Sequence, residues 1–153
     1  MLPRTGALLG VDFGTRRIGI AICNPEQTIA MPLETLHRSV PARELARWKE
    51  LATDYRIVGL VCGLPLHAQS GDESKMSALA RSYMSWLAAE LRLTVDFQDE
   101  RHSSSEAELH FWATGRSPQK NKAKLDPVAA RVILQSYLDQ PRASGTNEEI
   151  SPQ

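Results

Sequence analysis

The chain has 153 residues, of which 42% are hydrophobic and 24% are charged, and its 18 Lys and Arg side chains balance 18 Asp and Glu side chains. This length and composition are typical of one compact globular domain. They exclude a disordered or fibrous chain and a protein built from two separate lobes. Because the formal net charge is zero, the field of the whole molecule does not attract a polyanion, so any nucleic acid would have to bind a local basic patch.

Features of targeting or membrane segments are not found. Residues 1–6 lead directly into an apolar run, without the charged region, apolar stretch and cleavage site of a signal peptide. No window approaches the ~18 consecutive apolar residues of a membrane-spanning helix. Cys23 and Cys62 lie in separate apolar runs, which favours buried thiols over a zinc site. We therefore expect a cytoplasmic protein that does not contact a membrane.

Apolar runs predict three strands at the N-terminal end. Residues 7–13 are apolar on both faces apart from Asp12, as expected for a central strand of a sheet. Turn residues separate this run from residues 18–23, and a second turn precedes residues 28–33. These three segments are expected to form an antiparallel meander.

The hydrophobic period then changes from two to 3.6 residues, which predicts helices. After Ser39, a candidate N-cap, the next helix is expected to extend to Tyr55, which falls on its apolar stripe. Residues 76–91 carry an unbroken series of apolar side chains at helical spacing. Short apolar runs at residues 57–62 and 94–98 predict two further strands.

Two more helices are expected near the C-terminal end. The first would cover residues 103–114 and stop at Gly115, and the second would cover residues 127–138. In that second helix Asp126 would be the N-cap and Pro127 would occupy the first helical position.

The order of these elements predicts an α/β fold. Its sheet would be mixed and five-stranded, with a three-stranded antiparallel meander plus two crossover strands, and helices would flank it. A single domain would span residues 1–139. Residues 140–153 are rich in Pro, Ser, Gly, Asn and Glu, and they are expected to be a disordered tail.

Three acidic residues stand at the ends of predicted elements: Asp12, Glu100 and Asp126. Each has an ordinary explanation. Asp12 can accept hydrogen bonds from the turn that follows it, Glu100 can form a solvated ion pair with Arg101, and Asp126 can be a helix cap. Together they suggest more, because three converging carboxylates repel one another unless divalent cations lie among them. Oxygen ligands without a His or Cys cluster favour Mg²⁺ or Mn²⁺, which would bind a phosphodiester.

Several motifs occur in a fixed order along the chain: residues 10–21 (GVDFGTRRIGIA), 63–66 (GLPL), 99–101 (DER), and Asp126 followed by residues 129–130 (AA) and 133–138 (ILQSYL). As a set they resemble the YqgF family, also called RuvX, over about residues 7–139. The resemblance implies a ribonuclease H-like fold and a metal-dependent nuclease. It also implies processing of the 5′ end of precursor 16S ribosomal RNA, or alternatively Holliday junction resolution on branched DNA.

The resemblance also implies roles for single residues. Asp12, Glu100 and Asp126 would be the catalytic residues and the ligands of Mg²⁺ or Mn²⁺. Arg17 and Arg101 would lie close to the substrate phosphates, and the neighbouring Asp99 would help to position water or metal. The sequence departs from the family pattern at His67 and at His102, whose roles the resemblance does not supply.

A basic segment, residues 116–124, carries four positive charges and no acidic residue. We expect it to be a loop between two helices, where Lys120, Lys122 and Lys124 would hold the backbone of a nucleic-acid strand without reading its sequence. The alternative is a solvated flexible loop. The aromatic residues of the predicted helices, Trp86 among them, are expected to pack in the core rather than to stack on bases.

Two other functions compete with a nuclease. The residues that follow Asp12 also suit the phosphate-binding turn of actin-like ATPases and sugar kinases, but those proteins need a second lobe that 153 residues do not provide. The other competitor is a nucleic-acid-binding protein that keeps the fold without catalysis. A homodimer would suit a symmetric junction as substrate, although no segment of the sequence identifies an interface.

Overall fold

The computed structural model describes residues 2–64, 75–99 and 118–141; residues 1, 65–74, 100–117 and 142–153 lie outside the described part, as do the side chains of residues 118–125. The described elements run in the order β1, β2, β3, α1, β4, α2, β5 and α4. Within these ranges no helix is both long and apolar enough to cross a membrane.

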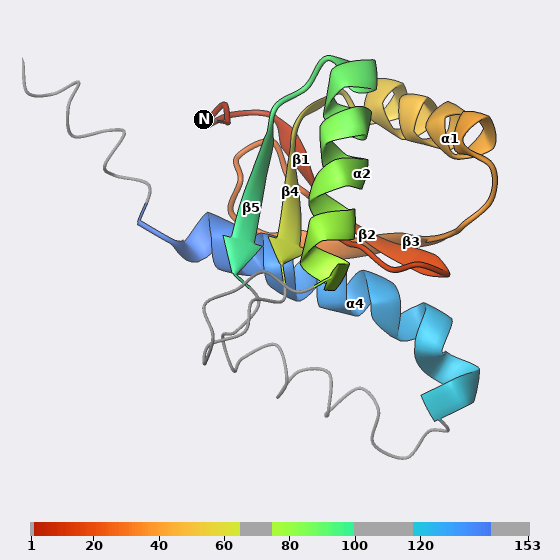
Figure 1. The fold of residues 1–153 in the computed structure, drawn as a ribbon. Coiled ribbons are helices and arrows are strands. Elements are labelled where there is room, and N and C mark those ends of the chain that lie inside the picture. Colours follow the sequence, from red (N-terminus) through yellow and green to blue (C-terminus); the bar gives the residue numbers. More distant parts are fainter. Residues whose placement is uncertain (1, 65–74, 100–117, 142–153) are drawn as a thin grey trace, which may run out of the picture.

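The sheet has five strands in the order β3-β2-β1-β4-β5, as Figure 1 shows. Its strands are β1 (Ala7–Asp12), β2 (Arg17–Cys23), β3 (Ala30–His37), β4 (Ile57–Leu64) and β5 (Val95–Asp99). The pairs β1–β2 and β2–β3 are antiparallel, whereas β1–β4 and β4–β5 are parallel. The predicted mixed sheet, a meander with two crossover strands, is therefore confirmed.

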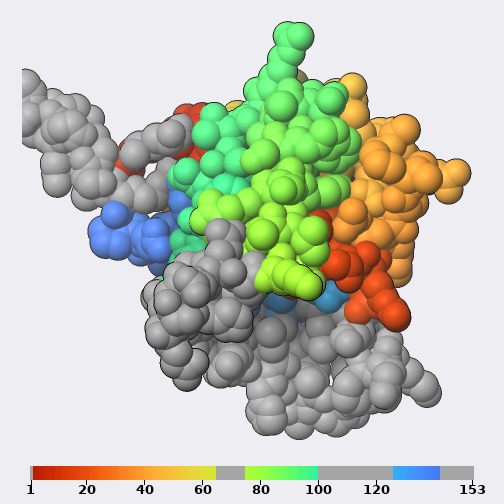
Figure 2. Space-filling view, in the orientation of Figure 1, coloured from red at the N-terminus to blue at the C-terminus, as the bar shows by residue number. Residues whose placement is uncertain are grey.

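Helices cover both faces of the sheet. Figure 1 shows α2 (Lys75–Leu91) in front of the sheet and α4 (Pro118–Asp139) behind it, and Figure 2 shows α1 (Pro41–Asp54) beside α2 on the visible face. Alternation along β1 divides its side chains between two cores. Leu9 packs with residues of α1 and α2, whereas Leu8 packs with residues of α4.

Several predicted boundaries are wrong by a few residues, among them both ends of α1 and the end of β3. Ser39 is not the N-cap of α1, because the cap is Val40 and the backbone N–H of Ser39 instead donates to Glu44 Oε2 at 2.7 Å. Tyr55 lies just beyond the end of α1 and is 44% exposed, so it is not part of the buried stripe. The third strand runs to His37 rather than to residue 33, because its polar second half pairs with β2 at the edge of the sheet.

The largest correction concerns α4. The prediction starts this helix at residue 127 with Asp126 as its cap, but the helix begins at Pro118, so Asp126 and Pro127 both lie inside it. Pro118 has the place at the helix start that the prediction gave to Pro127, and the good helix formers that follow it extend the helix. Pro127 removes one backbone donor without ending the helix. The basic segment is consequently helical from Pro118 onward and not a loop.

Other predictions fall partly or wholly outside the described residues. The expected helix at residues 103–114 lies outside them, and so does the predicted tail from residue 142 onward. Gln140, the first residue of that predicted tail, is described, and its side-chain amide donates to Gln98 Oε1 at 2.8 Å. Cys23 and Cys62 are both buried thiols, as the sequence indicates.

Candidate active site

The edge of the sheet where β1, β4 and β5 end collects the acidic residues. Asp12 is the last residue of β1 and is half-buried. Asp99, also half-buried, is the last residue of β5 and pairs with Leu64, the last residue of β4. Because parallel strands end at the same edge, the polar groups at these ends share one side of the sheet, which is the usual place for a site in an α/β fold.

Asp126 of α4 lies near this edge because Gly19 of β2 allows the helix backbone to pack closely against the strand. Gly19 stands opposite Asp12 in the antiparallel pair of β1 and β2. A Cβ atom at Gly19 would collide with the backbone carbonyl of Asp126, so the backbone of α4 lies directly on β2 at this point. A single glycine therefore has one of the three predicted acids as its strand partner and another as its packing partner on the helix.

Asp12 and Asp126 line the same cavity, which has a volume of about 310 Å³. The turn at residues 13–16 and Arg17 form much of its wall, and Met76 of α2 contributes from the other side. Two of the three predicted metal ligands are therefore together. The third, Glu100, lies outside the described residues, directly after Asp99. Within the described part of the chain, no group of three His, Cys, Asp or Glu side chains is placed to hold a metal ion.

Arg17 binds Asp126 inside this cavity. Its Nε donates to Asp126 Oδ2 at 2.8 Å, and the two side chains are 23% and 21% exposed. The ion pair joins the first residue of β2 to the middle of α4 and places a positive charge in the cavity wall. Hydrogen bonds between ionised partners are shorter and stronger than neutral ones, so this contact restrains the Asp126 carboxylate in one orientation.

Arg38, which the sequence analysis did not identify, supports the turn that follows Asp12. Its Nη1 donates to the carbonyl of Gly14 at 2.9 Å, and its backbone N–H donates to the carbonyl of Arg16 at 3.0 Å. The guanidinium also lies 5.2 Å from the centre of the Phe13 ring, within the range of a cation–π contact. One arginine therefore contacts three residues of the turn between β1 and β2.

Glu44 of α1 holds Arg38 in this position. Arg38 Nε donates to Glu44 Oε2 at 2.9 Å, and the hydroxyl of Tyr83 donates to Oε1 at 2.8 Å. Trp48 Nε1 in turn donates to the Tyr83 hydroxyl at 2.9 Å. The sequence carries one signal for this role, because Glu44 precedes Trp48 by four residues and so falls on the buried face of the helix.

The hydrogen bonds keep Glu44 ionised although it is only 2% exposed. Burial alone would raise its pKa, but the donors Ser39 N–H, Tyr83 and Arg38 more than offset this, and the pKa of Glu44 lies below its usual value. The pKa of the Tyr83 hydroxyl is raised, first by burial and then by its bond to Glu44. The pair that supports the turn is therefore a charged one, with Tyr83 neutral beside it.

The remaining predicted substrate contacts are less completely described. Lys120, Lys122 and Lys124 belong to the first part of α4, and Lys122 precedes Asp126 by one helical turn. Arg101 lies outside the described residues. These residues stay predictions, whereas Arg17 is placed in the cavity itself.

The profile of the RuvX family, described as a Holliday junction resolvase, matches residues 6–140. The chain belongs to the RuvX family. Two relatives are each named "Putative pre-16S rRNA nuclease". The Rhodopirellula baltica protein is 37% identical over 94% of this chain and 82% of its own length. The Anaeromyxobacter dehalogenans protein is 40% identical over 86% of this chain and 95% of its own length. The resemblance seen in the motifs is thereby confirmed, and RuvX membership disfavours the ATPase interpretation.

Solved structures confirm the fold of this RuvX family member. The RuvC protein of Thermus thermophilus, in complex with a Holliday junction substrate, matches with a TM-score of 0.56 at 16% identity, over 92% of this chain and 97% of that one. The fowlpox virus resolvase in complex with Holliday junction DNA matches with a TM-score of 0.51 at 13% identity, over 87% and 97%. At such low identity these matches establish a shared RuvC-like, α/β architecture and nothing about substrate.

Proposed function

We propose that this protein is a divalent-metal-dependent nuclease that processes the 5′ end of precursor 16S ribosomal RNA in the cytoplasm. The observation that carries the proposal is the cavity shared by Asp12 and Asp126, which are far apart in the sequence. Membership of the RuvX family supports nuclease chemistry, and the names of the relatives support the substrate. Glu100, directly after the strand end at Asp99, is the proposed third acid.

The donor atoms of the cavity fit Mg²⁺ or Mn²⁺. Among the described residues of its wall, two are carboxylates and none is His or Cys. Hard oxygen donors of this kind suit Mg²⁺ and Mn²⁺ better than zinc. When bound, such ions polarise the phosphoryl oxygens and lower the pKa of a bound water. The chain's own contribution is to hold Asp12 at the end of β1 and Asp126 on α4, with the third ligand supplied by Glu100.

Arg17 has two roles in this proposal. Its bond to Asp126 Oδ2 fixes the orientation of that carboxylate before substrate arrives. Its guanidinium also presents positive charge to an incoming phosphate, and Arg is well suited to phosphate recognition because of its several donors. The basic residues Lys120, Lys122 and Lys124 at the start of α4 would extend this attraction along the strand backbone, and Arg101 would add to it beside Glu100.

The direct test is cleavage of a precursor 16S ribosomal RNA 5′ end by the purified protein. Cleavage is expected with Mg²⁺ or Mn²⁺ and not with a chelator present. Asp12→Asn and Asp126→Asn should each abolish it while the protein remains folded by circular dichroism. Asp54→Asn is the matched control, because Asp54 is an exposed residue at the end of α1. Equal cleavage by the Asp12→Asn protein would contradict the proposal.

The description of the family as a Holliday junction resolvase supports a second candidate substrate, branched DNA. A junction with two-fold symmetry requires two active sites, so this alternative predicts a homodimer. A four-way DNA junction assayed beside the RNA, with the molecular mass measured in solution, separates the two. Cleavage of the junction by a dimer would favour the alternative, and cleavage of the RNA alone would favour the primary proposal. A protein that binds either substrate without cutting it would be a non-catalytic nucleic-acid-binding protein.

A further inference from the structure

The cavity lined by Asp12 and Asp126 is called the acidic cavity below. A second cavity, of about 360 Å³, lies beside it. The two share Phe13, which follows Asp12 directly in the chain. They are also lined by successive turns of α2, with Met76 in the acidic cavity and Leu79 in the second one. A nucleic-acid strand with a phosphodiester in the acidic cavity can therefore place a neighbouring nucleotide in the second cavity.

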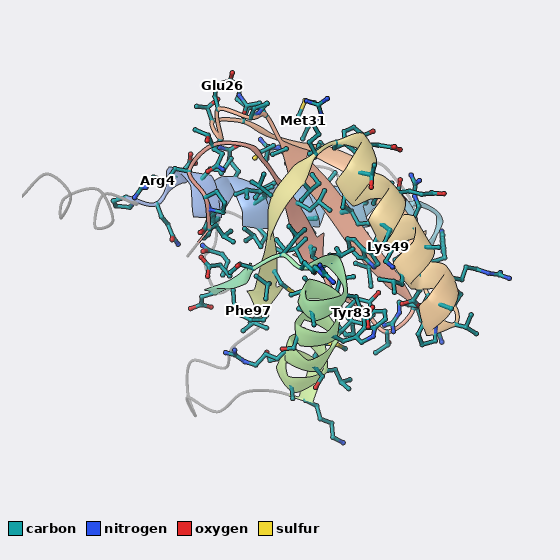
Figure 3. The ribbon with its side chains drawn as sticks, turned by 90° about the horizontal axis from the view of Figure 1, so that it is seen from above. Arg4, Glu26, Met31, Lys49, Tyr83 and Phe97 are labelled. Carbon is teal, nitrogen blue, oxygen red and sulfur yellow. The ribbon has the colours of Figure 1, made fainter. Side chains whose placement is uncertain are left out.

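Three aromatic side chains, Phe13, Tyr83 and Trp86, line the second cavity. The ring centres of Phe13 and Tyr83 are 5.3 Å apart, and those of Tyr83 and Trp86 are also 5.3 Å apart. Arg38 lies over the Tyr83 ring at 4.8 Å. Figure 3 shows Tyr83 on the side of α2 that faces α1. Leu79, which belongs to the apolar series of residues 76–91, is 49% exposed and lines this cavity.

Trp86 differs from Trp48 in a way that the sequence does not predict. Trp48 is fully buried and donates its indole N–H to Tyr83, so its role is structural. Trp86 is only half-buried and lines the cavity. The expectation that both tryptophans are packing residues therefore holds for Trp48 and leaves Trp86 with a ring surface turned toward the cavity.

The charged residues of this cavity favour a neutral occupant. Arg38 and Glu44 are both in its wall, but they neutralise each other through the 2.9 Å ion pair. A phosphate group would meet the Glu44 carboxylate as well as Arg38, and repulsion between like charges opposes this. A flat ring without charge can instead stack on aromatic side chains or on a guanidinium plane, which is how proteins hold unpaired bases. The volume is at the lower end of the ~300–1,000 Å³ typical of small-ligand pockets.

We propose that this cavity binds one unpaired nucleobase of the strand whose phosphodiester lies in the acidic cavity. The proposal rests on the nucleic-acid substrate of the proposed function and assigns to Phe13, Tyr83 and Trp86 the binding of a base near the cut site. Stacking accepts every base, so the site selects an unpaired nucleotide rather than a sequence. A base paired within a duplex would have to leave its stack before it could enter.

The test measures binding separately from cleavage. Short single-stranded RNA oligonucleotides spanning the cut site, each with one abasic residue at a different position, are titrated into the full chain by fluorescence anisotropy in Ca²⁺. Ca²⁺ takes the same type of oxygen ligands as Mg²⁺. We expect one abasic position to bind about tenfold more weakly than the others, because stacking of one base accounts for an effect of that order. Matched DNA oligonucleotides show whether the base effect requires ribose.

Two variants link the effect to the cavity. Ser82→Tyr places a ring into the second cavity from an exposed position of α2, and Thr53→Tyr adds the same ring at an exposed position near the far end of α1. Ser82→Tyr should weaken binding of the complete oligonucleotide about tenfold and remove the additional cost of the abasic position. Thr53→Tyr should change neither value. Trp86→Ala should reproduce the Ser82→Tyr result without filling the cavity.

The outcomes separate this proposal from the proposed function. An abasic effect that Ser82→Tyr removes, in a protein that does not cleave, would support the base site and contradict the nuclease. Cleavage by a protein whose binding is the same at every abasic position would support the nuclease and overturn the base site. An abasic effect that survives unchanged in both Ser82→Tyr and Trp86→Ala would also overturn it, as would the absence of binding to any RNA or DNA oligonucleotide.

Discussion

Glu44 and Arg38 form an ion pair of 2.9 Å that joins the start of α1 to the residue after β3. Neither residue lines the acidic cavity, but Arg38 also bonds the carbonyl of Gly14, two residues after Asp12. The pair therefore links the packing of α1 to the position of the turn between β1 and β2.

Glu44→Gln is expected to destabilise the protein by about 1–3 kcal/mol, because it leaves Arg38 and the Ser39 amide with a weaker acceptor in a buried position. The measurement is urea unfolding followed by circular dichroism. Glu34→Gln provides the control, since Glu34 pairs with Arg47 at a more exposed place. That change should cost less than about 1 kcal/mol. Equal costs for the two variants would show that the buried pair has no special role.

The contribution of Glu44 to stability should depend on pH. Its pKa is lower in the folded protein than its ordinary value of 4.5, so ionised Glu44 stabilises the fold fully above that value. As the pH falls below 4.5 and through the folded pKa, this stabilisation is lost. The difference in unfolding free energy between the wild type and Glu44→Gln should therefore be constant near neutral pH and shrink on acidification. A difference that grows below pH 4.5 would contradict the assigned direction.

Gly19→Ala should displace α4. The added Cβ atom would meet the backbone carbonyl of Asp126, which cannot rotate away as a side chain can. We expect a destabilisation of about 1–3 kcal/mol, as for other overpacked sites, together with loss of cleavage because Asp126 moves. Gly59→Ala is the comparison, since its Cβ would meet the flexible ends of Leu2 and Leu8. That variant should keep its activity, and full activity of Gly19→Ala would contradict the role given to this contact.

Arg17→Gln should weaken RNA binding and make it less dependent on salt. Removing one phosphate-binding cation lowers the slope of the logarithm of the binding constant against the logarithm of the salt concentration by about one. Binding measured between low and moderate salt gives this slope. Lys49→Gln, at an exposed position of α1 labelled in Figure 3, should leave it unchanged. An unaltered slope for Arg17→Gln would mean that Arg17 serves only to hold Asp126.

Most of the fold could be predicted from the sequence, because the two hydrophobic periods separate cleanly along the chain. The five strands and their mixed arrangement follow from apolar runs such as the one that ends at Asp12. The second half of β3 could not be predicted in this way. It contains Glu34 and Thr35, and an edge strand can carry polar residues because one side of it is not covered by another strand.

Proline misled the prediction at α4. A proline after an N-cap residue such as Asp or Ser is a common helix start, which is why the sequence pattern assigns Pro127 to the first helical position. The same signal occurs at Ser117 and Pro118, and the structure places the helix start there. Only the packing of α4 on β2 distinguishes these two possible helix starts, because the lack of a side chain at Gly19 allows the backbone of Asp126 to lie against the strand. That contact joins distant parts of the chain and has no local sequence signal.

The candidate site could be predicted only in part, because several of its contacts join residues that are distant in the sequence. Asp12 could be selected because a carboxylate inside an apolar strand is costly without a partner, whereas Asp126 could be selected as a metal ligand only from the resemblance to the YqgF family. Arg38 and Tyr83 could not be selected, because an arginine after a strand and a tyrosine on an amphipathic helix are common in surface and core positions alike. Their roles arise from tertiary contacts with Glu44 and with the turn.

The central claim is that Asp12 and Asp126 are ligands of the same cation site. A crystal structure of the wild-type protein with Mn²⁺, in which anomalous scattering locates the ions, tests it most directly. We predict a Mn²⁺ peak in the cavity lined by both residues, with carboxylate oxygens from each at about 2.0–2.2 Å, and with Glu100 completing the site. A Mn²⁺ ion bound elsewhere, or no bound ion while Arg17 still holds Asp126, would contradict the account.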